Sequence, residues 1–539
     1  MAKKMNGAQA LMKTLVDAGV EVCFSNPGTS EMHFVAALDN EPKMRAVLAL
    51  FEGVATGAAD GYARMADKPA ATLLHLGCGL GNGLANLHNA RKGKVPMINI
   101  VGDHATYHVK YDAQLQSDIE TVARNVSPEF VRTSQSTDAL CQDAADAITS
   151  ARTYPNKIST LILPADVSWG EGAKPATVAA IPEAPVAADE VVGEIAKAIQ
   201  SGKKTALLLG GRALREPSLM AAAKIAAKHG VKLFAETFPT RIERGEGLPA
   251  VERIAYLAEM VGVQLADIKN LITVDAKAPV SFFAYPGKKS YLVPDGCKLF
   301  TLASEEQDTT QSLNKLVAAL GATDTQPELQ PASRPSRPKG KLTAEKVCQA
   351  VGHLMPDNSI IVDEAITSGL MLNAMTTGSP RHDMLTLTGG AIGQGLPSAV
   401  GAAVAHRGCQ WNQSAHAWIS RDRCVTHCHT RRNGVGGVAT ETMAGDRDRL
   451  SVDQRANSGR VVRCALHECI DDSDHIERTI HRILISFRTN TQHQFHSRIA
   501  GVIGCHHHVA MARQRLGVVG MDVAQTTRTM AVHHQREWP

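Results

Sequence analysis

The chain has 539 residues, of which 44% are apolar and 20% charged, and its formal net charge is +4. This length exceeds one ordinary core, so we expect two to four domains. The small net charge argues against a nucleic-acid partner, and we find no signal peptide and no apolar run that could cross a bilayer. We therefore expect a cytoplasmic globular protein with no nucleic-acid or membrane partner.

Residues 1–172 alternate helical and strand patterns. A Pro-Gly turn follows the first strand and opens the next helix. The helix is expected over 8–18 and the apolar strands over 21–25, 70–75, 95–102 and 159–166. Apolar strands separated by helices predict a parallel sheet covered on both faces.

Two linkers divide the chain between residues 173 and 405. A Pro- and Ala-rich linker over 174–188 precedes a middle domain over 189–322, and a Pro- and Ser-rich linker over 323–341 precedes a third domain over 342–405. The expected elements are strands over 205–209, 271–275, 298–303 and 359–363, and helices over 342–355 and 398–405. We predict an α/β fold of three doubly wound parallel-sheet domains, the third incomplete.

Residues 406–539 differ in composition from the rest. They contain no lysine and no tyrosine, but 14 of the 22 histidines and 18 arginines. Such a bias is unusual for a folded domain. We interpret the segment as an unrelated, frame-disrupted tail, with a genuine divergent tail as the alternative. Its clusters at 424–429 and 506–508 could ligate zinc, but their spacing is a weak signature.

Glu52 is the strongest candidate for chemistry. It follows an apolar strand and enters a helix of small residues, a place where the helix dipole also favours an ordinary carboxylate. We expect Leu50, Phe51 and Val54 to give it an apolar setting.

Five motifs, in order, resemble the pyrimidine-binding domain of thiamine-diphosphate enzymes. They are Ser25–Glu31, the segment around Glu52, Leu74–Ala90, Val101–His104 with Asp112–Asp118, and Leu161–Val167. The resemblance extends through residues 1–405. It is closest to acetolactate synthase large-subunit-like proteins, and benzoylformate decarboxylase is nearer in some loops.

The resemblance implies roles for single residues. Glu52 matches the glutamate that hydrogen-bonds the coenzyme's aminopyrimidine and promotes its activation for attack on a 2-oxoacid. His75 matches a catalytic histidine of benzoylformate decarboxylase, with a satisfied strand-end histidine as the alternative. Pro27, Gly28 and Asn82 match coenzyme-binding positions.

Further histidines and the middle domain carry weaker signals. His104 and His108 lie in a loop beside the expected site. The decarboxylase has a second histidine in its middle domain, where this chain reads Ser281-Phe-Phe-Ala-Tyr; this weakens a pure decarboxylase interpretation. Acetolactate synthases often bind FAD in that domain. Here Gly210-Gly-Arg is no dinucleotide fingerprint, so a cofactor-free domain is favoured and FAD stays open.

In the third domain, the resemblance implies that Thr367 and Ser368 contact the coenzyme's diphosphate. It also implies that Gly389 and Gly390 cradle the aminopyrimidine and that Ile392 holds the coenzyme bent. The family then requires a Gly-Asp-Gly strand end and paired asparagines that bind Mg²⁺.

The metal motif is missing from the sequence after residue 405. Gly445-Asp446-Arg447 lacks the second glycine and the asparagines. We therefore assign no metal ligands, although Mg²⁺ is expected for the family.

Together these observations predict a thiamine-diphosphate-dependent transferase or lyase. The first hypothesis is a 2-oxoacid carboligase resembling acetolactate synthase, which implies branched-chain amino acid biosynthesis. The resemblance also implies a homodimer or homotetramer with the coenzyme between two chains. The alternatives are a benzoylformate-type decarboxylase and, from another class, a non-catalytic product that lacks the metal motif. We expect the activity of this chain to be impaired.

Overall fold

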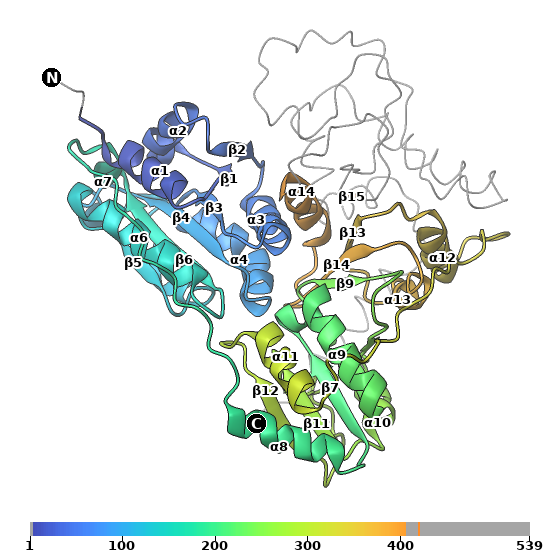
Figure 1. Ribbon diagram of the computed structural model, residues 1–539. Helices are drawn as coiled ribbons and strands as arrows, with labels where there is room; N and C mark the ends of the chain where they lie inside the picture. The colour runs from blue at the N-terminus through green and yellow to red at the C-terminus, as the bar shows by residue number, and fades with distance from the viewer. Residues whose placement is uncertain (1–3, 406–418, 421–539) are drawn as a thin grey trace, which may run out of the picture. The chain divides into compact units, whose positions relative to one another are not determined.

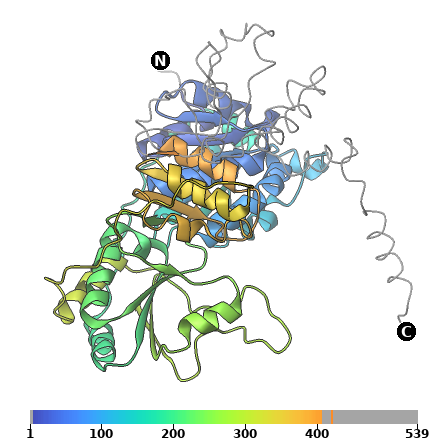
Figure 2. The same cartoon turned by 90° about the vertical axis from the view of Figure 1, so that its right-hand side faces the viewer.

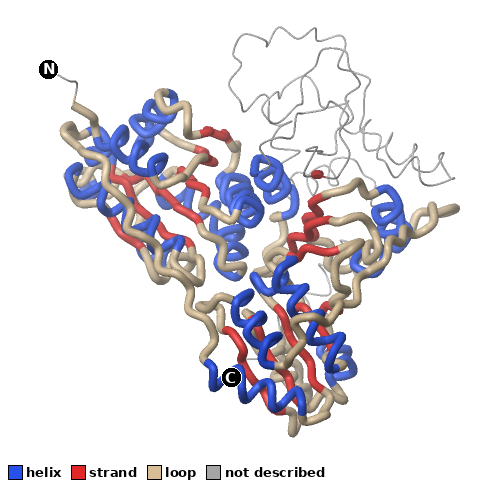
Figure 3. Tube along the Cα trace, in the orientation of Figure 1, coloured by secondary structure: helices blue, strands red, loops and turns tan. Residues whose placement is uncertain are grey.

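The computed structural model describes residues 4–405 and 419–420, which all belong to the first of the chain's two units (Figure 1). The strands form three sheets, and helices cover the faces of each sheet (Figure 3). The predicted α/β class with parallel sheets is confirmed. No described helix is long and apolar enough to cross a membrane. Apart from strand β15 (Ile419–Ser420), the predictions for the tail lie outside the described residues.

The first sheet has six strands, and every neighbouring pair is parallel. Their order is β2 (Arg45–Leu48), β1 (Val22–Asn26), β3 (Ala70–Leu74), β4 (Met97–Asp103), β6 (Ile158–Pro164) and β5 (Val131–Thr133). One face packs against α1 (Gly7–Asp17), α2 (Met32–Asp39) and α6 (Thr137–Arg152). The other carries α3 (Glu52–Ala66), α4 (Leu76–Lys92) and α5 (Ile119–Arg124), while α7 (Ala165–Trp169) follows β6. Burial of both faces explains the continuous apolar runs of the central strands.

The second sheet has five parallel strands. Their order is β10 (Glu252–Arg253), β8 (Lys232–Ala235), β7 (Thr205–Leu209), β11 (Asn270–Val274) and β12 (Lys298–Ala303). One face packs against α8 (Asp189–Gln200), α9 (Glu216–His229) and α11 (Thr309–Ala319), and the other against α10 (Ala258–Leu265) (Figure 2). The chain winds outward from β7 to β8 and returns to β11 on the other side. The loops after β7 and β11 therefore flank the topological switch point.

The third sheet is mixed. Its order is β15, β13 (Ser359–Asp363), β14 (His382–Thr386) and β9 (Ile242–Arg244). Only β13 and β14 pair in parallel, and β9 comes from the middle segment to pair antiparallel with β14. One face packs against α12 (Ala344–Leu354) and α13 (Leu372–Met375), and the other against α14 (Gly395–Ala405). The middle segment thus contributes a strand to the third sheet.

Helices α3 and α14 cross in close contact because glycines stand at the crossing. A Cβ on Gly61 would lie 1.9 Å from the carbonyl oxygen of Ser398, and one on Gly401 would lie 1.7 Å from the carbonyl oxygen of Ala58. Neither position accepts a side chain without moving a backbone. The small-residue composition of both helices is therefore a packing requirement.

A buried polar network accompanies this crossing. Asp60 on α3 accepts hydrogen bonds from Arg64 (2.9 Å), Gln394 (2.9 Å) and Ser398 (3.2 Å). Burial raises the pKa of the Asp60 carboxyl, while Arg64 acts in the opposite direction. Arg64 also donates to the carbonyl oxygen of Thr386 on β14 at 2.8 Å. The network ties the first sheet's helix to the third sheet.

We predict that Asp60→Ala lowers the free energy of unfolding by about 3 kcal/mol, because it leaves the buried Arg64 charge without its carboxylate. Urea titration of the purified chain measures this. Asp17→Ala, which removes an exposed i,i+4 pair with Lys13, is the matched control and should leave the midpoint nearly unchanged. Equal effects of the two substitutions would contradict the role of the Asp60 network.

Candidate active site

The carboxyl ends of β1 and β3 bring two separate motifs together. These strands are parallel neighbours, with Asn26 opposite Leu74. Pro27 and Gly28 follow β1 directly, and His75 follows β3. Loops that leave the carboxyl ends of parallel strands are the usual place for a site in such sheets.

Glu52 is the first residue of α3 and is 6% exposed. Its Oε2 accepts a hydrogen bond from the side-chain amide of Asn82 at 3.0 Å. A Cβ on Gly79 would lie 2.9 Å from its Oε1. The carboxyl group is therefore held between the first turn of α3 and the N-terminal half of α4, and the coenzyme-binding role expected for Asn82 stays a prediction.

The expected apolar setting of Glu52 is only partly present. Val54 is buried, but Leu50 and Phe51 are 48% and 42% exposed. The expectation therefore holds for Val54 and was wrong for Leu50 and Phe51, whose side chains are about half exposed in the loop between β2 and α3. The glycine- and asparagine-bearing side of α4, rather than a ring of apolar side chains, covers the carboxyl group.

His75 is held by a buried glutamate that sequence analysis missed. Its Nδ1 lies 2.8 Å from Oε2 of Glu31, and the Gly28 amide donates to the same oxygen at 2.7 Å. Glu31 is 1% exposed. An ionised Glu31 accepts a hydrogen bond from Nδ1–H of His75, and in the neutral form of the ring Nε2 is then the acceptor nitrogen.

Gly28 makes room for the imidazole. A Cβ at this position would lie 2.2 to 2.6 Å from three atoms of the His75 ring. The spacing of Gly28 and Glu31, three residues apart, is that of a helix-start capping motif, and the short helix η1 (Thr29–Glu31) begins there. This signal predicts a turn and does not reveal the histidine contact.

Several buried polar atoms near this edge have no hydrogen-bond partner among the described residues. They are Glu31 Oε1, His104 Nε2, Gln116 Oε1 and Ser117 Oγ. Buried polar atoms are normally hydrogen-bonded. These side chains leave acceptor and donor atoms free for a polar ligand at this edge of the sheet.

His104 and His108 lie in the loop after β4, as expected from the sequence. Their rings are 5.3 Å apart, and His108 lies 5.8 Å from the Tyr111 ring. The His104 amide donates to Asp103, whose pKa is raised by burial. Within the described part of the chain, no hydrogen bond joins either ring to Glu52 or His75. The interpretation of both as ordinary loop histidines, with a functional role as the alternative, therefore stays untested.

The loop after β14 that contains Gly389 and Gly390, called the glycine loop below, contacts the C-terminal end of α4. The side chain of Asn89 donates to the Ala391 carbonyl at 2.7 Å and accepts from its amide at 3.1 Å. His88 lies 3.1 Å from the Gly389 carbonyl oxygen. Asn89 follows Asn82 by seven residues, about 10 Å along the helix. Among the described contacts, Gly389 and its neighbours thus meet the C-terminal part of α4, and the Asn82 that binds Glu52 lies in its N-terminal part.

The remaining third-domain candidates are exposed. Thr367 and Ser368 lie on the surface after β13, and Ile392 is 63% exposed. Glu364, which sequence analysis did not single out, accepts from the amides of Gly393 (3.0 Å) and Gly395 (2.7 Å). It thus occupies amides at the N-terminus of α14, where carboxylates are favoured.

An aromatic cluster lies beside the glycine loop. Phe282 contacts Phe238, Tyr256 and Phe283, with ring centroids 4.8 to 5.8 Å apart. A Cβ on Gly390, which has φ +77°, would lie 3.1 Å from the Phe282 ring. The stretch that replaces the decarboxylase's second histidine is therefore adjacent to the predicted aminopyrimidine loop.

The sequence is similar to those of known proteins. Residues 5–124 match the family described as "Thiamine pyrophosphate enzyme, N-terminal TPP binding domain". The chain is 56% identical over 401 residues to "Putative acetolactate synthase large subunit IlvX" of Mycobacterium tuberculosis, covering 74% of this chain and 77% of the relative. The chain belongs to the thiamine-diphosphate-dependent enzyme family.

More distant relatives of this thiamine-diphosphate enzyme include decarboxylases. Benzoylformate decarboxylase of Pseudomonas aeruginosa is 27% identical over 418 residues, covering 72% of this chain and 76% of the relative. The solved structure of a 4-hydroxybenzoylformate decarboxylase from Rhodococcus jostii has a TM-score of 0.65 at 19% identity, covering 74% of this chain and 79% of that chain. The structural likeness concerns the fold.

Glu52 on α3 and Asn82 on α4 fit one half of a thiamine-diphosphate site, the half that would hold the aminopyrimidine ring. Glu52 is a buried carboxyl group with one oxygen bound by Asn82, and unpartnered polar atoms lie at the same sheet edge. The described residues do not provide a metal site: among residues 4–405, no group of three or more His, Cys, Asp or Glu side chains could hold a metal ion. The expected Gly-Asp-Gly position lies outside the described residues.

We predict that Gly28→Ala destabilises the chain by about 1–3 kcal/mol, because the added methyl group collides with the His75 ring. The cost should shrink strongly in a His75→Ala background, since the two positions are in contact. Urea unfolding of the four proteins measures the coupling. Gly81→Ala on the open face of α4 is the control; additive effects at Gly28 and His75 would contradict the described geometry.

Proposed function

We propose that this chain has the architecture of a thiamine-diphosphate-dependent 2-oxoacid carboligase of the acetolactate synthase type. The observation that supports this proposal most strongly is the buried Glu52, which accepts a hydrogen bond from Asn82 and lies beside the Glu31–His75 pair. The 56% identity to a protein named as an acetolactate synthase large subunit supports the same assignment. Such a carboligase joins the carbon unit left by decarboxylation of one 2-oxoacid to a second carbonyl compound.

The residues of the site have distinct tasks in this proposal. Thiamine diphosphate, when bound, supplies the nucleophilic carbon and the electron sink. Asn82 holds Oε2 of Glu52, which leaves Oε1 to hydrogen-bond the aminopyrimidine ring. Glu31 fixes the His75 ring through Nδ1, so Nε2 is the atom that accepts or returns a proton at the substrate.

The carboligase is favoured over a benzoylformate-type decarboxylase by the aromatic cluster. A decarboxylase must deliver a proton to the carbon that has lost CO₂. The stretch beside Gly390 offers Phe282 and Phe283 in place of an imidazole, and phenyl rings donate no proton.

A second copy of the chain is part of the proposal. Within one chain, the glycine loop lies about 10 Å along α4 from the residues that hold Glu52. This spacing supports a coenzyme whose aminopyrimidine is shared between Glu52 of one chain and the glycine loop of another. We propose a homodimer or homotetramer in which Glu52 of one chain faces the glycine loop of its partner.

The second candidate is a non-catalytic chain, and one observation favours it for this molecule. Residues 406–539 contain neither Gly-Asp-Gly nor paired asparagines, and they carry the composition of a frame-disrupted segment. Without these ligands, Mg²⁺ and the diphosphate would not be held. We propose that activity is impaired in this chain although its first 405 residues retain the site.

A chimera separates these proposals. Residues 1–405 are joined to the corresponding C-terminal part of the Mycobacterium tuberculosis relative, and pyruvate consumption is compared with that of the native chain. We expect turnover only in the chimera, and a loss of about 10²–10⁴-fold on Glu52→Gln, because that substitution removes the acid–base group.

The exposed Glu129→Gln is the matched control for Glu52→Gln and should retain turnover. Native-chain turnover equal to that of the chimera would refute the proposed impairment. A folded chimera that binds no thiamine diphosphate would refute the carboligase assignment.

The aromatic cluster gives a further expected outcome. In the chimera, Phe282→His should increase the fraction of aldehyde relative to ligated product, because an imidazole beside Gly390 can donate a proton. Product analysis by gas chromatography measures the ratio. The control is Tyr285→His at the far end of the cluster, and an equal shift in both variants would argue against a role for Phe282.

A further inference from the structure

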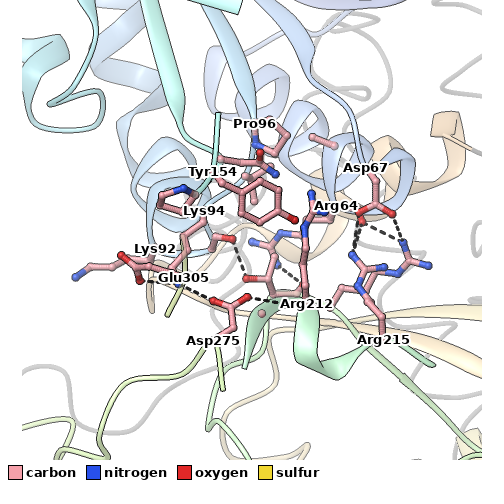
Figure 4. Close-up of a pocket in the computed structure, with 18 of the residues that line it drawn as sticks. Arg64, Asp67, Lys92, Lys94, Pro96, Tyr154, Arg212, Arg215, Asp275 and Glu305 are labelled. Atoms are coloured by element: carbon pink, nitrogen blue, oxygen red, sulfur yellow. Dashed lines mark hydrogen bonds and ion pairs between the residues drawn. The ribbon is translucent and has the colours of Figure 1, made fainter. Parts of the chain in front are cut away.

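A crevice opens at the switch point of the second sheet, outside the carboxyl ends of β7, β8 and β11 (Figure 4). Its free volume is about 90 Å³. In open parallel sheets this is where nucleotides bind, on backbone amides of the turn after the first strand. The acetolactate synthase resemblance raises the expectation of FAD in this place.

The amides of that turn are already occupied by the chain's own acceptors. The Gly210 amide donates to the Val274 carbonyl at 3.0 Å. The Gly211 amide donates to Oε1 of Glu236 and the Arg212 amide to Oδ2 of Asp275, both at 2.9 Å. Carboxylates thus take the positions that a diphosphate would need.

The absence of side chains at Gly210 and Gly211 lets the residues after β8 and β11 approach the turn closely. A Cβ on Gly211 would lie 2.2 Å from Oδ2 of Asp275, and one on Gly210 would lie 2.4 Å from the Asp275 carbonyl oxygen and 3.0 Å from Oε1 of Glu236. Gly211 has φ +42°, a conformation that favours glycine. The glycine turn therefore admits protein carboxylates at close range, which explains its sequence without a nucleotide.

A lysine from the N-terminal part closes the crevice from the other side. Lys94, just after α4, lies 3.2 Å from Oδ1 of Asp275 and 2.7 Å from Oε2 of Glu305. Burial alone would lower the pKa of Lys94, but the two carboxylates raise it above its ordinary value. The lysine stays charged and joins the loop after α4 to the loops of the second sheet.

A second contact crosses the crevice. The guanidinium of Arg212 lies over the Tyr154 ring, 4.3 Å from its centroid. Figure 4 shows Tyr154 and Lys94 reaching from the first sheet's side toward Arg212 and Asp275. Nucleotide-sized ligands bind in pockets of about 300–1,000 Å³, several times the volume left here.

We propose that Lys94, Asp275 and Glu305 form an internal ionic latch that, together with the Glu236 side chain on the Gly211 amide, replaces a nucleotide, and that this chain binds no flavin dinucleotide. A dinucleotide would have to displace two carboxylates from the turn and would bring its own negative charges against them. The latch instead fixes the C-terminal end of α4, the helix that carries Asn82. Flavin content and stability report on the latch whether or not the chain is catalytically active.

The test uses the full chain, purified from cells supplied with riboflavin. Flavin released by heat denaturation is quantified by fluorescence, and FAD is then titrated to about 100 µM, far above the dissociation constants of tightly held cofactors. We expect no stoichiometric flavin and no saturable binding, in a sample that shows cooperative thermal unfolding. One flavin per chain, or saturable binding lost on Arg212→Ala, would overturn the proposal.

A double-mutant cycle tests the latch itself. Lys94→Met and Asp275→Asn should each lower Tm by about 3 °C or more, and the double variant should lose clearly less than the sum. Lys288→Met, which removes an exposed pair with Glu259, is the control and should leave Tm unchanged. Additive losses at Lys94 and Asp275 would show that the two groups do not act together.

Discussion

Helix α4 contacts residues from each of the three sheets along its length. Near its start, Gly79 and Asn82 pack on Glu52 of the first sheet's helix. Near its end, Asn89 binds the loop after β14. Immediately beyond it, Lys94 reaches Asp275 at the end of β11. A shift of this helix would change all three contacts, so the position of the Glu52 carboxyl group depends on the packing of the whole described chain.

This dependence explains why the helix is rich in glycine and asparagine. Glycine allows the approach of Glu52 and of the Thr56 side chain, whose γ-methyl lies 2.9 Å from where a Cβ on Gly83 would stand. The asparagines supply hydrogen bonds to neighbouring backbones, such as that from Asn86 to the Gly53 carbonyl at 2.6 Å. These residues have low helix propensity, and tertiary contacts offset that cost. The motif that resembles the family is therefore also a packing motif.

The sequence predicts the strands that are buried on both faces, because such strands are rich in apolar residues. The central strands β3, β4, β6, β7 and β11 are continuous apolar runs and were expected within one or two residues. The strands β5, β8, β9 and β10 were not predicted, because they are short and carry exposed or polar residues. The apolar strand expected directly before Glu52 is present as β2, but it ends at Leu48. Strand β14 was missed although it is fully buried. Its His382 and Asp383 are polar, and only the tertiary structure supplies the Arg241 that pairs with Asp383.

The residues of the candidate site also include some that the sequence predicts and some that it does not. Glu52, His75 and Asn82 could be proposed because they stand in motifs that resemble a known family. Glu31 could not, because its role requires the pairing of β1 with β3, which a local pattern does not reveal. The separation of the glycine loop from Glu52 is likewise a property of the packed chain. It is consistent with a site that needs a second protomer.

The central proposal is that residues 1–405 hold one half of a thiamine-diphosphate site, while residues 406–539 lack the Gly-Asp-Gly and paired asparagines that are expected to bind Mg²⁺. Calorimetric titration of thiamine diphosphate into the purified native chain, with and without Mg²⁺, tests this most directly. We predict no Mg²⁺-dependent binding. Micromolar, Mg²⁺-dependent binding that Glu52→Gln abolishes would contradict the claim, because the site would then be complete in this chain.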